Sequence, residues 1–195
     1  MFMKKLIYLF SLCLLLASCG HKMQTQPSPA SFVNPLMGTS STFAFSHGNT
    51  YPAVAVPWGM NFWSPQTGEN GSGWMYMYTD SLIRGFNKIR GFKQTHQPSP
   101  WINDCGTFSI MPLLGKVIMD NKSRGVGFRH ENEKAAPNCY QVKFDNGVTT
   151  ALSATSRGAV FEVTYPSEEG QYIVIDAYQH GGNVALDAER NCIYG

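Results

Sequence analysis

Glycine and proline interrupt this chain every few residues, and their spacing leaves little room for an α-helix. The sequence holds 19 glycines and 11 prolines in 195 residues. Both residues end helices, whereas short strands joined by turns accept them between segments. The only helix-like stretch is residues 80–89, and it is short. We therefore expect an all-β domain.

Short alternating segments support this expectation. Strands are predicted where β-branched and aromatic residues dominate and a turn follows. Such segments are residues 53–56, 73–78, 108–113, 140–144, 149–155, 159–165 and 172–177. Asn146-Gly147 is a hairpin signal, and the continuous apolar run of 172–177 predicts a central strand. Successive strands and turns of this kind favour an antiparallel β-sandwich.

The last residues predict one more hairpin, formed by residues 183–187 and 191–195. A strand that ends in Ile193 and Tyr194 would leave apolar side chains at a sheet edge. We therefore expect the chain to be the front piece of a longer protein, with its sandwich incomplete at the C-terminus. Expressed alone, such a piece would expose an apolar patch and tend to aggregate.

Composition and charge exclude several classes of protein. Apolar residues make up 43% of the chain and charged residues only 14%, which is typical of a globular domain and not of a disordered one. Two of the 15 basic residues, Lys4 and Lys5, lie at the extreme N-terminus, so 13 basic residues face 13 acidic ones in the remainder. A nucleic-acid partner is not expected, because phosphate contacts need clustered lysine and arginine.

The N-terminus has the pattern of an export signal. Two lysines precede an apolar run at residues 6–16 that is too short to span a bilayer comfortably, and the run ends in Leu16-Ala17-Ser18-Cys19. This ending resembles the bacterial lipobox, which implies a lipoprotein signal peptide at residues 1–18 and lipidation of Cys19. The alternative is an ordinary signal peptide with an incidental cysteine. Residues 19–31 are polar and rich in proline and serine, and are interpreted as a flexible tether.

The remaining cysteines do not define a framework. Cys105, Cys139 and Cys192 are three in number, and no Cys-x-x-Cys pair occurs. One disulfide and buried free thiols both remain open.

Aromatic residues gather where the loops are polar, which favours sugar binding. All four tryptophans lie between positions 58 and 101. An indole face stacks on the C–H face of a pyranose, while amides and carboxylates take its hydroxyls. We expect Trp58, Trp63 and Trp74 in the core. Trp101 lies among turn residues and suits a ligand platform, and a pair of His96 with Asp104 would orient a sugar hydroxyl.

Several motifs resemble the start of glycoside hydrolase family 92. They are Val33-Asn34-Pro35-Leu36-Met37-Gly38-Thr39, Gly48-Asn49-Thr50-Tyr51-Pro52, Val56-Pro57-Trp58-Gly59-Met60, the long run from Arg90 through Gln94-Thr95-His96-Gln97-Pro98-Ser99-Pro100-Trp101 to Asp104, and Phe108-Ser109-Ile110-Met111-Pro112. The resemblance covers residues 32–195 in order, and its most specific part is the string from Gln94 to Trp101.

The resemblance implies a calcium-dependent exo-acting α-mannosidase with an N-terminal β-sandwich and a C-terminal (α/α)6 barrel. Residues 32–195 would then be the sandwich, and the barrel would be its partner. Inverting hydrolysis needs a carboxylic acid and a carboxylate base. In the family these groups and the calcium ligands come from the barrel, so no general acid, general base or metal ligand is assigned to this chain.

What the resemblance carries over is substrate binding. Trp101 would flank the pocket of the leaving sugar, and His96 and Asp104 would bond hydroxyls or fix their loop. The loop of Gly38, Thr39 and Phe43 would approach the terminal mannose. Cys105 departs from the family, which has an aromatic residue after the aspartate, and this puts the packing beside Asp104 in doubt.

Three functions follow from these observations. The first is the N-terminal part of an α-mannosidase that acts on terminal α-mannosides of glycans in the periplasm or at the cell surface, lipid-anchored to the outer membrane. The second is a carbohydrate-binding surface lipoprotein without hydrolytic activity. The third is a structural scaffold without a ligand.

Overall fold

The computed structural model describes residues 27–42, 44–45, 50–68, 76–78, 88–95, 106, 108–177 and 182–195. Within these ranges the chain forms eleven strands, a short 3-10 helix at Pro29–Phe32, a further 3-10 turn at residues 44–45, and no α-helix. The all-β prediction is confirmed. Of the stretch 80–89 that looked helical, the described part, Lys88–Ile89, is a strand.

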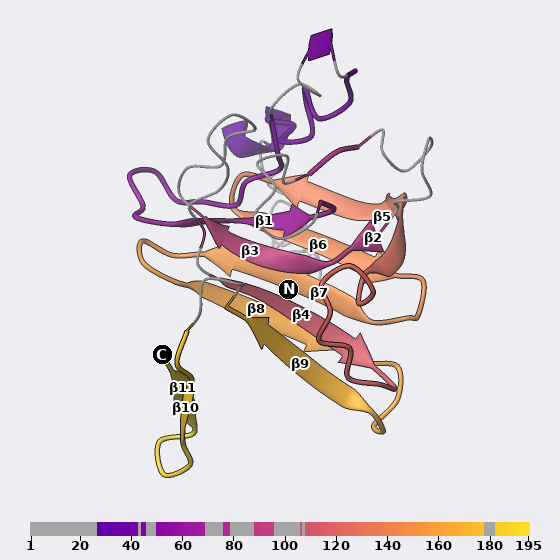
Figure 1. The fold of residues 1–195 in the computed structure, drawn as a ribbon. Helices are drawn as coiled ribbons and strands as arrows, with labels where there is room; N and C mark the ends of the chain where they lie inside the picture. The colour runs from indigo at the N-terminus through magenta and orange to yellow at the C-terminus, as the bar shows by residue number, and fades with distance from the viewer. Residues whose placement is uncertain are drawn as a thin grey trace, which may run out of the picture.

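Two antiparallel sheets and a separate hairpin contain the strands. The first sheet has the order β1 (Phe62–Gln66), β3 (Gly91–Thr95), β4 (Phe108–Leu114) and β9 (Gln171–Asp176). The second has the order β2 (Lys88–Ile89), β5 (Val126–Ala136), β6 (Cys139–Phe144), β7 (Thr149–Ala154) and β8 (Ala159–Thr164). The hairpin pairs β10 (Ala185–Asp187) with β11 (Cys192–Tyr194). The sheets lie face to face, which confirms the sandwich (Figure 1).

Phe92 on β3 is the centre of the packing between the sheets. Its ring lies 5.9–6.4 Å from three rings of the second sheet, those of Tyr140, Phe144 and Phe161. Phe92 and Tyr140 are fully buried. Edge-to-face pairs at these separations are a favourable way to pack aromatic rings. The strand that carries the long family-like motif is therefore fixed by the core.

The hairpins of the C-terminal half follow their sequence signals. Asn146-Gly147 links β6 and β7, and the 183–195 segment forms the predicted β10–β11 pair. The position of β9 is a correction, because residues 172–177 were expected to form a central strand. β9 lies at the edge of the first sheet, and Ile173 and Ile175 are exposed. Ile173 and Ile175 pair with Pro112 and Ile110 on β4, so their side chains lie on the face that is turned toward the second sheet. The second sheet ends at its edge strand β8, and no described element beyond β8 covers these two side chains.

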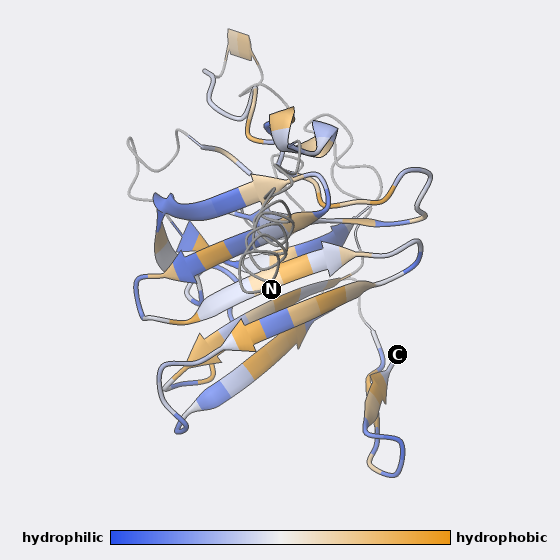
Figure 2. Cartoon of the chain, turned by 180° about the vertical axis from the view of Figure 1, so that it is seen from behind, coloured by the Kyte–Doolittle hydropathy of each residue, from blue (hydrophilic) through white to orange (hydrophobic). Residues whose placement is uncertain are grey.

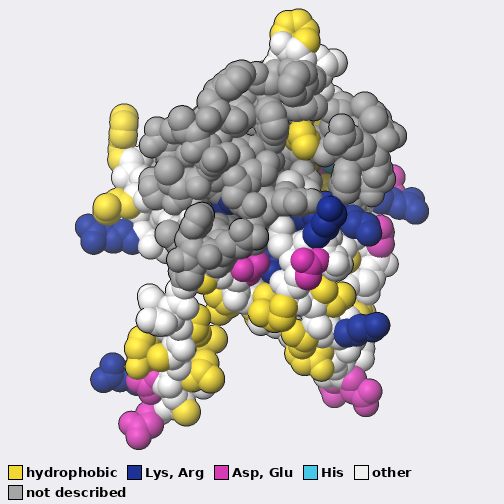
Figure 3. All heavy atoms as spheres, viewed as in Figure 1, with side chains coloured by type: hydrophobic (Ala, Val, Ile, Leu, Met, Phe, Trp, Pro, Cys, Tyr) yellow, Lys and Arg dark blue, Asp and Glu magenta, His cyan; other side chains and the backbone are white. Residues whose placement is uncertain are grey.

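Exposed apolar side chains also mark the β10–β11 hairpin. Leu186, Ile193 and Tyr194 are all more than half exposed. Figure 2 shows the strands of the hairpin as mostly hydrophobic and the loop that joins them as hydrophilic. In Figure 3 hydrophobic side chains lie open on the hairpin and on the lower end of the sandwich. This agrees with the apolar patch expected from the sequence.

Trp58 was expected in the core, and this prediction is wrong. Trp58 is fully exposed, with φ of +61°, whereas Trp63 is buried as expected. The Gly59 N–H donates to Val56 O at 3.0 Å and closes a tight turn with Pro57 and Trp58 at its corners. The positive φ of Trp58 at the third residue is the feature of a type II turn, and such turns lie at the surface. Trp74 lies outside the described residues.

The structure describes two of the three remaining cysteines. Cys139 and Cys192 are exposed free thiols, so they form no disulfide with each other and are not buried. Cys105 lies outside the described residues.

The Asn146-Gly147 turn gives a direct stability prediction. Gly147 has φ of +88°, and a Cβ at this position would lie 3.1 Å from Pro166 Cγ. Gly147→Ala is expected to cost roughly 1–2 kcal/mol of unfolding free energy, because a residue with a Cβ disfavours this backbone conformation. The matched control is Gly158→Ala, whose Cβ would meet only Thr155 Oγ1 at 3.6 Å. Urea unfolding measures both, and equal losses would contradict the strain argument.

Candidate functional site

The motif residues leave and re-enter the sandwich at one end of the first sheet. β3 and β4 are antiparallel neighbours, and Gln94 pairs with Phe108. The intervening segment therefore starts and finishes on adjacent strands. His96, Trp101 and Asp104 belong to this segment and lie outside the described residues, as do Phe43 and Cys19. Their roles stay predictions, but the strands that hold both ends of the segment are defined.

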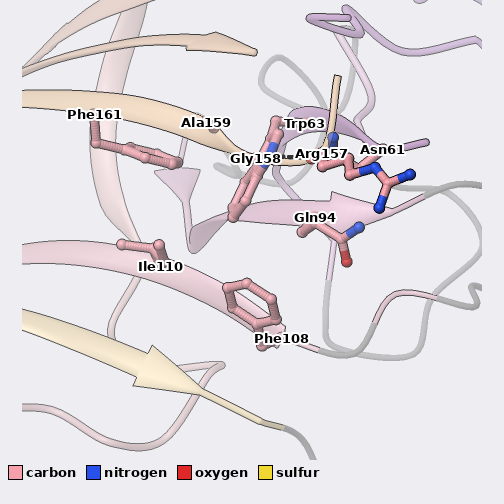
Figure 4. Close-up of a pocket in the computed structure, with 9 residues that line it drawn as sticks. All are labelled: Asn61, Trp63, Gln94, Phe108, Ile110, Arg157, Gly158, Ala159 and Phe161. Carbon is pink, nitrogen blue, oxygen red and sulfur yellow. Dashed lines mark hydrogen bonds between the residues drawn. The ribbon is translucent and has the colours of Figure 1, made fainter. Parts of the chain in front are cut away.

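A cavity of about 430 Å³ opens between the sheets at the same end. It is lined by Asn61, Trp63, Gln94, Phe108, Ile110, Arg157, Gly158, Ala159 and Phe161. Figure 4 shows the rings of Trp63, Phe108 and Phe161 on one side and the polar ends of Gln94 and Arg157 on the other. An apolar wall with a few polar groups is typical of small-ligand sites, and suits a ring that has an apolar face and a hydroxyl rim.

Hydrogen bonds fix part of this wall. Trp63 Nε1 donates to Asn61 Oδ1 at 2.9 Å, and Asn61 Nδ2 donates to Thr155 O at 3.3 Å. Asn61 therefore connects the indole to the turn between β7 and β8. Sequence reasoning missed this cavity, because its lining comes from four strands that are distant along the chain.

Gly38 and Thr39 are the predicted sugar contacts that the structure describes. Gly38 is exposed, with φ of +83°, and an added Cβ would lie 2.9 Å from Thr50 Oγ1. A glycine is therefore required by the turn itself. Thr39 is fully buried; its hydroxyl donates to Leu36 O at 2.8 Å and its carbonyl accepts from the Tyr78 N–H at 3.0 Å. Thr39 thus anchors the turn, and a contact with sugar remains a prediction for both residues.

A second polar site lies on the opposite face of the first sheet. Lys93 and Ser109 are cross-strand partners on β3 and β4, and Ser109 is opposite Asp176 on β9. Arg124, from the connection between β4 and β5, reaches this row: Nη1 lies 2.6 Å from Asp176 Oδ2, and Nη2 donates to Ser109 Oγ at 3.2 Å. Its Nε also donates to Arg90 O at 2.8 Å.

These bonds compensate the burial of Arg124, which is almost completely enclosed. A guanidinium presents five donors, so it can join two strands and a carboxylate at once. No local signal in the sequence identified Arg124, since it stands in a polar loop where an arginine is usually solvated. Only the fold brings it to Asp176.

The described residues hold neither a metal-binding cluster nor a membrane-spanning helix. No three His, Cys, Asp or Glu side chains come together there in a way that could hold a metal ion. No helix in those ranges is both long and apolar enough to cross a bilayer.

The fold and the motif-bearing strand point to a carbohydrate-active enzyme domain, and comparisons with known proteins define the family. The model for the glycosyl hydrolase family 92 N-terminal domain matches residues 32–193. The chain belongs to this family, and it contains the family's N-terminal β-sandwich domain.

Solved structures agree with this assignment. A family GH92 inverting mannosidase from Bacteroides thetaiotaomicron VPI-5482 is 66% identical, with a TM-score of 0.76 over 84% of this chain and 21% of its own. A family GH92 α-mannosidase from Bacteroides thetaiotaomicron is 28% identical, with a TM-score of 0.63 over 76% of this chain and 20% of its own. The latter has also been solved with mannoimidazole.

A curated relative is more distant. An uncharacterized secreted glycosidase of Arthroderma benhamiae is 22% identical over 148 residues, which make up 72% of this chain and 18% of the relative. The chain therefore spans about a fifth of the length of each of these relatives.

Lys93 gives a pH prediction for the polar face. Burial lowers the pKa of Lys93 from 10.5 to about 8. Between these values the unfolded chain keeps a proton that the folded chain has released, so the free energy of unfolding gains a contribution that rises with pH. Lys93→Met removes that contribution.

The measurement is urea unfolding at several values between pH 8 and 10. The stability of wild type relative to Lys93→Met is expected to increase across this window, and Lys143→Met, on the exposed side of β6, is the control that should follow wild type. A constant difference between wild type and Lys93→Met would rule out the buried lysine as the titrating group.

Proposed function

We propose that this chain is the N-terminal part of an exo-acting α-mannosidase that hydrolyses terminal α-mannosides of glycans, and that it supplies loops of the substrate pocket. The observation that carries this proposal is the β3–β4 pair, which holds both ends of the His96–Asp104 segment on strands of the core. Membership of the family and the similarity to two solved mannosidases support it.

In this proposal the substrate-binding residues are those of the family motif. Trp101 flanks the leaving sugar, His96 and Asp104 bond hydroxyls or fix the segment, and Gly38 and Phe43 approach the terminal mannose. Thr39 belongs to the same loop and holds it from inside, because it is buried and its hydroxyl, N–H and carbonyl are bonded to Leu36 O and the Tyr78 N–H. Exo-action requires a pocket closed around one terminal sugar, and loops from two domains can form one.

The reaction itself is assigned to the C-terminal barrel. Inverting hydrolysis requires two carboxyl groups about 6.5–9.5 Å apart, with water between one of them and the sugar. We propose that both groups belong to the barrel, as does the calcium site. The described residues of this chain do not assemble a metal-binding cluster. The chain alone is therefore proposed to be inactive.

The N-terminal signal supports a location outside the cytoplasm. Residues 1–18 would be removed, Cys19 would carry the lipid, and the tether would hold the domain at the outer membrane, in the periplasm or on the cell surface. A domain in either place would have access to glycans outside the cytoplasm. That the distant curated relative is described as a secreted glycosidase is compatible with export.

A second candidate is favoured by one observation. The cavity between the sheets has aromatic walls and a polar edge formed by Gln94 and Arg157, which is suited to holding sugar without cleaving it. A carbohydrate-binding surface lipoprotein would use this cavity and need no barrel.

Activity separates the two candidates. The protein at its natural length is expected to release 4-nitrophenol from 4-nitrophenyl α-mannoside, and a chelator is expected to abolish release, whereas the 195-residue chain alone should bind without turnover. Absorbance of the released phenolate is the measurement. Turnover by the isolated chain would contradict the assignment of both carboxyl groups to the barrel.

Trp101 tests the substrate-binding role. Trp101→Ala in the protein at its natural length is expected to weaken mannoside binding by about 1–2 kcal/mol, since one stacking contact is lost. Calorimetric titration with a mannobioside measures it. Trp58→Ala, a fully exposed tryptophan on another turn, is the matched control and should bind as wild type. Equal affinity in Trp101→Ala and wild type would remove Trp101 from the site.

A further inference from the structure

A buried carboxylate, that of Glu133 on β5, is the acceptor for three side chains. Its side chain has no exposed surface. The Tyr76 hydroxyl lies 2.8 and 2.9 Å from its two oxygens, the Tyr140 hydroxyl donates to Oε1 at 2.5 Å, and His130 Nδ1 lies 2.8 Å from Oε2. Burial and the neighbouring Glu133 charge raise the pKa of both tyrosines well above the usual value, so both remain donors.

His130 extends this cluster toward a second segment. Its Nε2 lies 3.3 Å from Tyr78 O, and its ring stacks on the Tyr78 ring with centroids 3.6 Å apart and an angle of 11°. Both ring nitrogens therefore face oxygens that accept hydrogen bonds. An imidazole Nδ1–H can donate to the Glu133 carboxylate, which is a charge-assisted hydrogen bond.

Residues 76–78 in turn hold the first family-like motif. The Tyr78 N–H donates to Thr39 O at 3.0 Å, next to Gly38, and the Met77 N–H donates to Thr67 Oγ1 at 3.0 Å. A continuous set of contacts thus runs from Glu133 through Tyr76 and Tyr78 to the Gly38–Thr39 turn. Tyr140 donates to the same carboxylate but lies on β6 and does not extend this path.

A buried charged group is a weak source of stability, because desolvation offsets most of its attraction to partners. Apolar residues of similar size would fill the same space at lower cost. A cluster with several directed hydrogen bonds is instead suited to fixing geometry. We infer that Glu133 is a positioning residue, which holds the Gly38–Thr39 turn in the geometry for sugar binding through Tyr76 and Tyr78. This inference rests on the proposed function.

The test compares two variants that each remove one hydroxyl from the same carboxylate, in the protein at its natural length. Tyr76→Phe weakens the path to the turn, whereas Tyr140→Phe does not touch it. Both residues are buried, so both variants should lose similar stability. Tyr76→Phe is expected to raise KM for 4-nitrophenyl α-mannoside roughly tenfold with little change in kcat, which is the signature of lost substrate binding.

Tyr140→Phe is expected to leave KM within about twofold of wild type, because the turn stays anchored. Glu133→Gln should reproduce the Tyr76→Phe effect, because the glutamine NH2 group is itself a donor and cannot accept a hydrogen bond from the surrounding donors. Glu131→Gln, an exposed change on the same strand, is the baseline control. Equal KM values in Tyr76→Phe and Tyr140→Phe would overturn the inference.

Hydrogen exchange provides a readout that needs no activity. The Tyr78 amide and the amides of residues 37–39 are expected to exchange at least tenfold faster in Tyr76→Phe than in Tyr140→Phe, because the turn loses its anchor. Equal exchange in the two variants would overturn the positioning role even in an inactive protein. A parent protein without mannosidase activity would instead refute the proposed function, and the exchange result would still decide whether Glu133 positions the turn.

Discussion

Burial of β3 on both faces is the constraint on which the rest of the structure depends. On one face, Phe92 packs among three aromatic rings of the second sheet. On the other, Arg124 joins the backbone of Arg90 to Ser109 and Asp176. β3 is therefore held from above and below, and the segment that follows it starts from a rigid strand. Functional loops need such support, because small displacements weaken binding.

The two faces of the first sheet are buried by different chemistry. For this reason the sequence of its strands shows no clear alternation of apolar and polar residues. The inner face is aromatic and closes by exclusion of water. The outer face buries polar residues such as Lys93 and Ser109, and burial of polar groups is unfavourable unless partners are provided. Arg124 provides such partners for Ser109 and Asp176 from a segment distant along the chain. The Glu133 cluster does the same for the buried hydroxyls of Tyr76 and Tyr140 elsewhere in the sandwich. Both groups thus join segments that are distant along the chain.

The regular C-terminal half could be predicted from the sequence, because there each strand has one apolar and one solvated face. β6, β7 and β8 follow their alternation within one or two residues. β5 was missed, since its eleven residues include six that are charged or polar and a register shift before Glu133. β1 and β3 were missed because both of their faces are buried, partly by polar residues, so no alternation remains. Likewise, Trp58 and Arg124 depend on a turn and on a tertiary contact that composition does not encode.

Successive side chains of β3 point to opposite faces of the sheet, so neighbouring residues of the family-like motif have different roles. Phe92 and Gln94 point toward the second sheet, where one fills the core and the other lines the cavity. Lys93 and Thr95 point to the other face and are fully buried there. The strand part of the motif is thus largely accounted for by folding, with Gln94 as its residue at the cavity. A resemblance over the whole string from Arg90 to Asp104 therefore does not make every residue a substrate contact. Selection on sugar binding would act mainly on the part beyond Thr95, while the part up to Thr95 is fixed in the first sheet.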